Sequence, residues 1–242
     1  MKNILDIKNL SYSFGNNPIL KDINIHVNKN EMVAIVGSSG VGKSTLFNLI
    51  AGVLKKQVGE ITINGSNDYI GKVAYMLQKD LLFEHKTIIN NVILPLIIAK
   101  VNKKKALEEG NKILKQFNLD KYANKYPQQL SGGMRQRVAL IRTYMFKRKI
   151  FLLDEAFSAL DAITKKELHK WYLDLKKEFN LTTLLITHDI EEAVFLSDRI
   201  YILGNKPGEI IEEIKIKINP NEDIDVQRLF YKKEILNIMN IE

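Results

Sequence analysis

The most informative stretch of this sequence is Met32-Val33-Ala34-Ile35-Val36-Gly37-Ser38-Ser39-Gly40-Val41-Gly42-Lys43-Ser44-Thr45. Its first five residues are apolar, as in a strand buried on both faces of a parallel sheet. Residues 37–45 follow the pattern in which glycines let successive backbone N–H groups converge on phosphate oxygens at the start of a helix. Lys43 would bring a positive charge to the β and γ phosphates, and the Ser44 hydroxyl would be a Mg²⁺ ligand. The flanking strand and helix favour a phosphate-binding loop over a chance glycine-rich turn.

A second apolar run, Ile150-Phe151-Leu152-Leu153, ends in the adjacent carboxylates Asp154 and Glu155. Consecutive side chains of a strand point to opposite sides. We therefore expect Asp154 to join the Mg²⁺ shell and Glu155 to face an attacking water. Transfer of a phosphoryl group to water needs charge neutralisation and a positioned nucleophile, which these two carboxylates can supply. An exposed acidic turn is the weaker reading, because the run before it is so apolar.

The pattern of the chain predicts an α/β fold. Further short apolar runs such as Leu184-Leu185-Ile186 alternate with helical stretches at 104–117 and 165–179, which indicates a mainly parallel sheet covered by helices. The first sixty residues differ, because Ile23–Val27 and Glu60–Ile63 alternate apolar and polar side chains. The second of these strands ends in a tight-turn pair, Asn64-Gly65. These strands predict an antiparallel β subdomain at the N-terminus.

The remaining segments complete a single domain over residues 1–242. Residues from about 79 to 149 are mostly helical and predict a helical subdomain, and a C-terminal helix is expected at about 226–239. The longest strongly apolar run, Val92–Ala99, is shorter than the roughly 20 residues that cross a bilayer and contains Pro95. If the protein works at a membrane, another chain must span it.

Composition excludes several function classes. The chain of 242 residues has no cysteine, which rules out disulfides, thiolate metal sites and a cysteine nucleophile. Its net charge of +8 could indicate a nucleic-acid partner. The basic residues are, however, scattered in small groups without interleaved aromatic residues, so we expect no nucleic-acid partner. His26, His85 and His169 show no metal-ligand spacing and are interpreted as structural or surface residues.

Three further motifs follow the phosphate loop in a fixed order. They are Leu130-Ser131-Gly132-Gly133-Met134-Arg135-Gln136-Arg137, then Ser158-Ala159-Leu160-Asp161 after the two carboxylates, and finally Thr187-His188-Asp189. With this series, the chain closely resembles the ATP-binding subunits of ABC transporters from about Leu5 to Ile214. The resemblance implies a P-loop ATPase core that binds ATP with Mg²⁺.

The resemblance also implies roles for single residues. Ser131, Gly132 and Gly133 resemble the signature loop, which binds the γ-phosphate held by the partner protomer of a homodimer. Gln78 resembles the Q-loop glutamine, which reaches Mg²⁺ and responds to the membrane subunit. His188 resembles the switch histidine, which contacts the γ-phosphate, and Asp161 resembles the D-loop aspartate, which crosses the dimer interface. Phe14 lies where the family stacks an aromatic ring on adenine, and Tyr12 is the competing candidate for that role.

Within the family, several segments are similar to importers of the nitrate, sulfonate and taurine group, to which thiamine-precursor importers also belong. These are the segments 154–164, 190–200 and Lys206-Pro207-Gly208-Glu209-Ile210. Two departures are Ala156, where a proline is usual, and Asn90-Asn91-Val92, where the family is more acidic. The second departure lies near the expected contact with the membrane subunit, which we place at residues 78–96 because Leu81, Leu82 and Phe83 look exposed. Packing within the helical subdomain is the alternative for these three.

The resemblance implies an ATPase that powers import of a small anionic or heterocyclic solute. It would work as a homodimer in the ATP-bound state, peripherally at the cytoplasmic face of the cell membrane. Its partners would be two integral membrane permease subunits and an extracytoplasmic solute-binding protein. The alternatives are an exporter or lipid-extraction ATPase, and a non-transport ABC ATPase. The last is disfavoured because Lys43 and Ser131 are too close in sequence for the long coiled coil of DNA-repair relatives.

Overall fold

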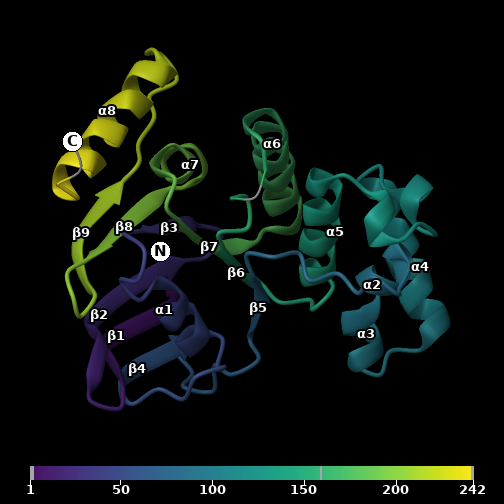
Figure 1. The fold of residues 1–242 in the computed structure, drawn as a ribbon, viewed down its shortest axis with the longest axis horizontal. Coiled ribbons are helices and arrows are strands. Elements are labelled where there is room, and N and C mark those ends of the chain that lie inside the picture. The colour runs from purple at the N-terminus through teal and green to yellow at the C-terminus, as the bar shows by residue number, and fades with distance from the viewer. Residues whose placement is uncertain (1–2, 159, 241–242) are drawn as a thin grey trace. The chain divides into compact units, whose positions relative to one another are not determined.

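The computed structural model describes residues 3–158 and 160–240 (Figure 1). The chain divides into two compact units. The first unit runs up to Val73 and also contains residues 149–155 and the chain from Leu175 onward. The second unit contains residues 74–148 and 156–174. Each unit is described by itself below.

An antiparallel sheet forms the N-terminal part of the first unit. Its strands are β1 (Asn3–Phe14), β2 (Asn17–Asn28) and β4 (Val58–Ile63), in the order β2-β1-β4. The expected alternation in β2 is confirmed, since Ile23, Ile25 and Val27 are buried. After β4 the backbone turns at Asn64 and Gly65, whose φ angles of 52° and 76° are the left-handed values that a tight hairpin turn requires.

The second sheet of this unit carries the parallel core. β3 (Met32–Val36) pairs in parallel with β7 (Thr182–Thr187) and β8 (Arg199–Gly204), and β6 (Ile150–Asp154) pairs in parallel with β7. β9 (Glu209–Lys215) is antiparallel to β8 at the edge. Every residue of β3, β6 and β7 is buried, which explains the apolar runs Met32–Val36, Ile150–Leu153 and Leu184–Ile186. The mainly parallel sheet predicted from sequence is thus confirmed.

The first unit contains the helices α1 (Lys43–Ile50), α7 (Ile190–Leu196) and α8 (Ile224–Ile238). The second unit begins within β5 (Val73–Met76) and contains α2 (Ile88–Val92), α3 (Leu94–Ile98), α4 (Lys103–Gln116), α5 (Gly132–Tyr144) and most of α6 (Ala162–Phe179). Two short 3₁₀ turns lie at Asp120–Tyr122 and Pro127–Gln129. Among the described residues, no helix is both long and apolar enough to cross a membrane.

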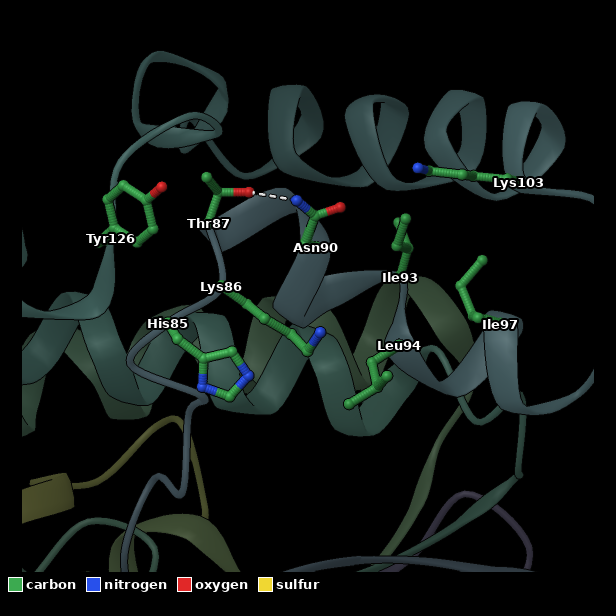
Figure 2. Close-up of a pocket in the computed structure, with 9 residues that line it drawn as sticks. All are labelled: His85, Lys86, Thr87, Asn90, Ile93, Leu94, Ile97, Lys103 and Tyr126. Atoms are coloured by element: carbon green, nitrogen blue, oxygen red, sulfur yellow. Dashed lines mark hydrogen bonds between the residues drawn. The ribbon is translucent and has the colours of Figure 1, made fainter.

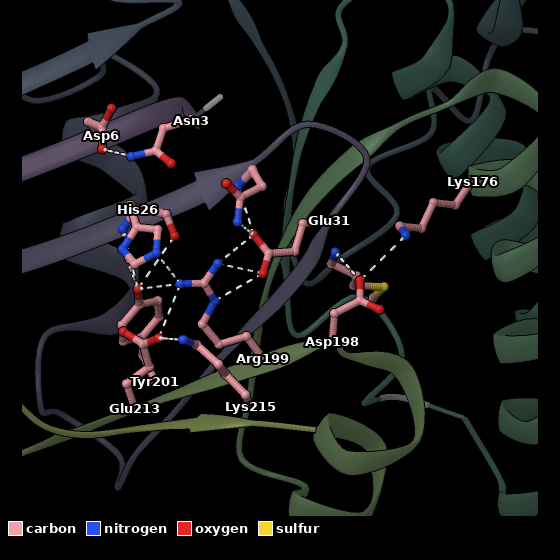
Figure 3. A network of polar contacts seen from close by, with 12 residues as sticks. Asn3, Asp6, His26, Glu31, Lys176, Asp198, Arg199, Tyr201, Glu213 and Lys215 are labelled. Carbon is pink, nitrogen blue, oxygen red and sulfur yellow. Dashed lines mark hydrogen bonds and ion pairs between the residues drawn. The ribbon is translucent and has the colours of Figure 1, made fainter. Parts of the chain in front are cut away.

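A buried cation joins the two sheets of the first unit (Figure 3). Arg199 on β8 is only 2% exposed, and its guanidinium donates to Glu31 at 2.5–2.9 Å and to Glu213 on β9 at 3.1 Å. It also contacts His26 of β2 and the Tyr201 hydroxyl. Burial raises the pKa of that Tyr201 hydroxyl to about 12. Arg199 therefore satisfies carboxylates that would otherwise be desolvated without a counter-charge.

We expect Arg199→Met to lower the free energy of unfolding by about 3–5 kcal/mol, because it leaves Glu31 without its buried partner. Urea unfolding followed by circular dichroism measures the change. Lys215→Met is the matched control, since Lys215 is largely exposed and 3.9 Å from Glu213. The free energy of unfolding of Lys215→Met should fall by less than about 1 kcal/mol. Equal decreases in the free energy of unfolding of the two variants would contradict the role of Arg199 in joining the two sheets.

Candidate functional site

The phosphate loop is shaped by two glycines that no other residue could replace. A Cβ on Gly37 would lie 2.3 Å from the carbonyl oxygen of Leu203 on β8. Gly42 has a φ of 109°, and a Cβ there would lie 2.7 Å from Cδ2 of Leu20 on β2. The loop thus follows the ends of β3 and β8 closely, and its backbone adopts a conformation that side chains would prevent.

Backbone groups at the start of α1 are available to an anion. Gly42 precedes the helix as its N-cap and has no side chain to cap it. Since the first turn reads Lys43-Ser44-Thr45, no acidic side chain competes for the helix N-terminus. The N–H groups and partial positive charge of such a terminus bind phosphate oxygens. Ser44 is exposed at this point.

Lys43 is held at the same place. Its side chain is buried at 7% exposure, and Nζ donates to the carbonyl oxygens of Gly37 at 2.8 Å and Ser38 at 2.9 Å. Burial lowers the pKa of the Lys43 ammonium, and the neighbouring carboxylates of Glu155 and Asp154 oppose that shift. An ammonium has three donors, so two bonds to the loop leave one for a phosphate.

Two carboxylates and a histidine lie at the carboxyl ends of β6 and β7. Asp154, the last residue of β6, is buried at 7% exposure, whereas Glu155 is partly exposed. Glu155 Oε2 lies 3.4 Å from Nδ1 of His188, which directly follows β7 and whose side chain is 61% exposed. The structure therefore brings together Lys43, Asp154, Glu155 and His188 within the first unit.

The backbone at Glu155 is strained. Its φ of 47° lies in the left-handed region, which residues with a long side chain rarely adopt. A hydrogen bond from Glu155 N to Ile186 O, 2.9 Å long, fixes this turn to β7. Backbone strain that persists in this way is concentrated at functional sites. The strain sets the direction in which the Glu155 carboxylate leaves the strand.

The two aromatic candidates for base stacking differ in exposure. Phe14, the last residue of β1, is 51% exposed, whereas Tyr12 is buried at 8%. Their rings meet edge to face with centroids 5.0 Å apart. Only Phe14 therefore presents a substantial part of its ring to a ligand.

Sequence reasoning missed the residues that support the phosphate loop from behind. Gly208 exchanges backbone hydrogen bonds with the start of β2, donating to Ile19 O and accepting from Lys21 N. A Cβ on Gly208 would lie 2.3 Å from the carbonyl oxygen of Val41. The sequence signal for this support is the segment Lys206-Pro207-Gly208, whose resemblance to the importer group implies no structural role.

The other predicted site residues lie in the second unit. Ser131 is the N-cap of α5, and its Oγ accepts from Met134 N at 3.3 Å. A Cβ on Gly133 would lie 2.4 Å from Cγ2 of Thr164, so α5 can pack here only with glycine. Gln78 is exposed, and its Nε2 donates to Ser158 Oγ at 3.3 Å.

Asp161 closes the turn before α6. Its Oδ1 accepts from the backbone N–H groups of Ile163 and Thr164, both at 3.1 Å. Hydrogen bonds from the side chain and backbone of Thr164 lower the pKa of Asp161. The carboxylate is thus ionised and fixed by its own turn. Ala159, in the same predicted motif, lies outside the described residues.

The family profile described as ABC transporter matches residues 20–158. The chain is 38% identical over 242 residues to the formylaminopyrimidine import ATP-binding protein ThiZ of Halalkalibacterium halodurans, with 97% of this chain and 96% of that protein covered.

This chain belongs to the ABC transporter family.

Two further comparisons agree with this assignment. The nitrate import ATP-binding protein NrtD of Synechocystis is 36% identical, with 93% of this chain and 87% of that protein covered. A solved dimeric, post-hydrolysis structure of the ATP-binding cassette MJ0796 with ADP and phosphate matches with a TM-score of 0.74 at 32% identity. The match covers 88% of this chain and 99% of the MJ0796 chain. The chain is accordingly an ATP-binding subunit with ATPase activity, and its cofactors are ATP and Mg²⁺.

The donor set suits Mg²⁺ bound together with a nucleotide. In the part of the chain that the structure describes, no group of three or more His, Asp or Glu side chains could hold a metal alone. Mg²⁺ in nucleotide sites is bound by one or two protein oxygens together with substrate phosphates. Asp154 and the exposed Ser44 hydroxyl, both in the first unit, are oxygen donors of this kind.

The second unit contains a loop, residues 79–86, that side chains of two helices hold in place. Arg142 of α5 donates to the carbonyl oxygens of Asp80 and Leu81, at 2.5 and 2.7 Å, and Arg135 of α5 pairs with Asp80 at 3.2 Å. Asn91, fully buried on α2, accepts from Phe83 N at 2.7 Å and donates to carbonyl oxygens of the loop. The loop is thus held by side chains from both helices.

The expectation that Leu81, Leu82 and Phe83 are all exposed is wrong for one of them. Leu81 and Phe83 are 53% and 43% exposed, but Leu82 is buried at 6%. Leu81 has a φ of 46°, and this left-handed residue interrupts the direction of the chain so that its neighbour turns inward. Exposure therefore alternates along the segment, and Leu82 packs within the second unit.

A hollow of about 390 Å³ opens beside this loop (Figure 2). Ile93, Leu94 and Ile97 contribute apolar side chains to its lining. Asn90, which belongs to the second departure noted in the sequence, also lines the hollow and donates to the Thr87 hydroxyl at 2.8 Å. The other lining residues are polar, cationic or aromatic, namely His85, Lys86, Lys103 and Tyr126.

Proposed function

We propose that this chain is the ATPase of an ABC importer for a small anionic or heterocyclic solute. It would act as an ATP-bound homodimer at the cytoplasmic face of the membrane, beneath two permease subunits served by an extracytoplasmic solute-binding protein. Relatives named as import proteins for formylaminopyrimidine and nitrate support the direction of transport and the class of solute. The observation that carries the catalytic part is the convergence of Lys43, Glu155 and His188 in one unit.

Each residue would have a distinct task in hydrolysis. Lys43 and the N–H groups of residues 37–45 bind the β and γ phosphates and offset their charge. Ser44, Asp154 and Gln78 would hold Mg²⁺, which would supply positive charge to the phosphate oxygens. Glu155 orients a water molecule and accepts its proton as the water oxygen attacks the γ-phosphorus, while the bond to the β-phosphate oxygen breaks. His188 orients the Glu155 carboxylate and contacts the γ-phosphate.

The second protomer would complete the site. Ser131 is exposed at the start of α5, where Gly132 and Gly133 present a second helix N-terminus. We infer that these residues bind the γ-phosphate held by the partner copy, and that Asp161 lies at the interface. A two-fold dimer then contains two identical shared sites. The dimeric cassette structure that this chain resembles supports such an assembly.

Phe14 is the residue we assign to adenine stacking, since Tyr12 is buried. Phe14→Ala should weaken binding of ATP and GTP alike by about 5- to 150-fold, because stacking tolerates any purine. Fluorescence titration with both nucleotides measures the loss. Tyr12→Ala removes the competing ring and is the comparison variant, whose nucleotide affinities should stay unchanged if the fold is kept. A loss confined to Tyr12→Ala would move the stacking role to Tyr12, and a loss confined to one nucleotide would remove the stacking assignment.

We propose that a segment of the permease binds in the hollow of Figure 2. Its apolar lining residues fit the hydrophobic face of a short helix, and Lys86 and Lys103 in the same lining favour a segment that carries carboxylates. The adjacent loop 79–86 is tied by Arg135 and Arg142 to α5, the helix that begins at Ser131. Movement of the bound permease segment would therefore be transmitted to the signature loop through the single helix α5.

Phe83→Asp should abolish solute uptake while basal ATP hydrolysis persists, because a charge at this exposed contact should weaken permease binding by about 30-fold or more. Val58→Asp, at a similarly exposed apolar residue of β4, is the matched control and should retain uptake. Leu82→Asp should instead lose both activities, since Leu82 is buried. Uptake and ATPase assays in proteoliposomes measure these outcomes. Retained uptake in Phe83→Asp would place the contact elsewhere.

Transport in cells tests the proposed direction. Deletion of the gene for this chain should abolish cellular uptake of labelled formylaminopyrimidine, nitrate or a sulfonate. Expression of the wild-type chain should restore that uptake. Glu155→Gln should fail to restore uptake. Normal uptake together with accumulation of an exported compound would favour the exporter alternative.

A further inference from the structure

The C-terminal helix α8 is fixed on the first unit by one of its faces. Ile235 is fully buried there, and Tyr231, Ile238 and Met239 pack against the same cluster of residues from β3, α7 and β8. The Arg228 guanidinium lies 4.7 Å from the ring of Phe195 on α7, and Lys232 forms an ion pair with Glu191 of α7. The helix is drawn in yellow in Figure 1. Its orientation on this unit is therefore determined by packing and charge.

The opposite face of α8 is apolar and exposed. Val226, Leu229 and Phe230 are 63%, 49% and 66% exposed, and they follow the spacing that places side chains on one helix face. Asp225, whose side chain is 93% exposed and lies 3.6 Å from the Arg228 guanidinium of the same helix, stands at one end of this stripe. Exposed Lys233 stands at the other end. Large apolar side chains gathered in this way mark an interaction surface.

We propose that this stripe binds the same stripe of a second copy of the chain, with the two α8 helices antiparallel around a two-fold axis near Leu229. Leu229 lies midway between Asp225 and Lys233 in the sequence, so antiparallel pairing places each Asp225 opposite the partner's Lys233. Parallel pairing would instead bring like charges together. An isologous contact requires a self-complementary patch, and the stripe has this property.

The contact is weak and independent of nucleotide. A single helix pair buries less than the roughly 1,200 Å² of a stable interface, so the association is transient in dilute solution. Two copies bound to one transporter are held close together, and the same contact is then favoured by their high effective concentration. It would keep the protomers paired between cycles of ATP binding. None of this rests on the catalytic roles proposed above.

A cysteine at the axis tests the geometry, because the natural chain contains no cysteine. Helix axes about 8–10 Å apart, with Cα atoms about 2.3 Å from each axis, bring two axial Cα atoms within about 3.4–5.4 Å, which overlaps the range for a disulfide. Leu229→Cys should form disulfide-linked dimers without nucleotide. Val53→Cys, at a similarly exposed site of the same unit, is the control and should remain largely uncrosslinked.

Charge exchange tests the pairing. Asp225→Lys and Lys233→Asp should each weaken nucleotide-free self-association by about tenfold, and the double exchange should restore it. A mixture of the two single variants should form heterodimers. Analytical ultracentrifugation of the full chain measures all four samples. Equal crosslinking of Leu229→Cys and Val53→Cys, or no effect of the exchanges, would overturn the proposal. Binding of a strictly monomeric chain to phosphatidylglycerol vesicles through Phe230 would also overturn it, because lipid would then be the occupant.

Discussion

Lys43→Ala should weaken ATP binding by about 10- to 150-fold. Each hydrogen bond from a charged donor contributes about 1.5–3 kcal/mol, and Lys43 has one donor left after its bonds to Gly37 and Ser38. Isothermal titration calorimetry measures the affinity. Lys55→Ala is the matched control, because Lys55 is exposed beyond the end of α1 and should leave binding unchanged.

Loss of fold must be separated from loss of binding in this variant, because Lys43 also ties the loop together. A thermal unfolding midpoint close to that of the wild type shows that the loop has kept its support. Under that condition, unchanged ATP affinity would contradict the assignment of residues 37–45 as the phosphate site.

Glu155→Gln should lower the rate of ATP hydrolysis by about 10²- to 10⁴-fold while ATP affinity is kept. The amide has the shape of the carboxylate but cannot accept the proton of the attacking water, and general bases contribute rate factors of this size. Phosphate release under saturating ATP and Mg²⁺ measures the rate. Glu60→Gln, at an exposed position of β4, should hydrolyse ATP at the wild-type rate. Wild-type turnover by Glu155→Gln would remove the base assignment.

Sequence could predict the parts of the site that depend on local patterns. A glycine loop between a buried strand and a helix has one main structural solution, so the places of Lys43 and Ser44 followed directly. Two carboxylates after an apolar strand likewise fixed Asp154 and Glu155 at the end of β6. Ser131 as a helix N-cap also matches its residue type.

Features that depend on distant residues could not be predicted. Nothing in the local sequence indicates that Gly208 supports Val41, because the two residues meet only after β8 and β9 have formed. The burial of Leu82 depends on a left-handed residue at Leu81, where sequence statistics favour glycine or asparagine. Asn91 is part of a departure from the more acidic family segment, and its local sequence does not indicate that it is fully buried and holds the loop 79–86 through three hydrogen bonds.

The extent of the helical region shows the same limit. The expected subdomain covered residues from about 79 to 149, whereas the second compact unit also takes in residues 156–174. Trp171 of α6 packs against Phe117 with ring centroids 5.0 Å apart, and Arg137 of α5 lies 5.8 Å from the Trp171 ring. These contacts join segments that are far apart in the sequence, and no periodicity within either segment encodes them.

The central claim is that ATP is hydrolysed in sites shared by two protomers. Its most direct test is sedimentation velocity of Glu155→Gln in a Phe230→Glu background, which removes the proposed α8 contact. With ATP and Mg²⁺ this chain should sediment as a dimer, and with ADP as a monomer. Adding Ser131→Arg should abolish the dimer while each monomer still binds ATP. A chain that binds ATP but remains monomeric in Glu155→Gln/Phe230→Glu, or that dimerises equally well with Ser131→Arg, would contradict the shared site.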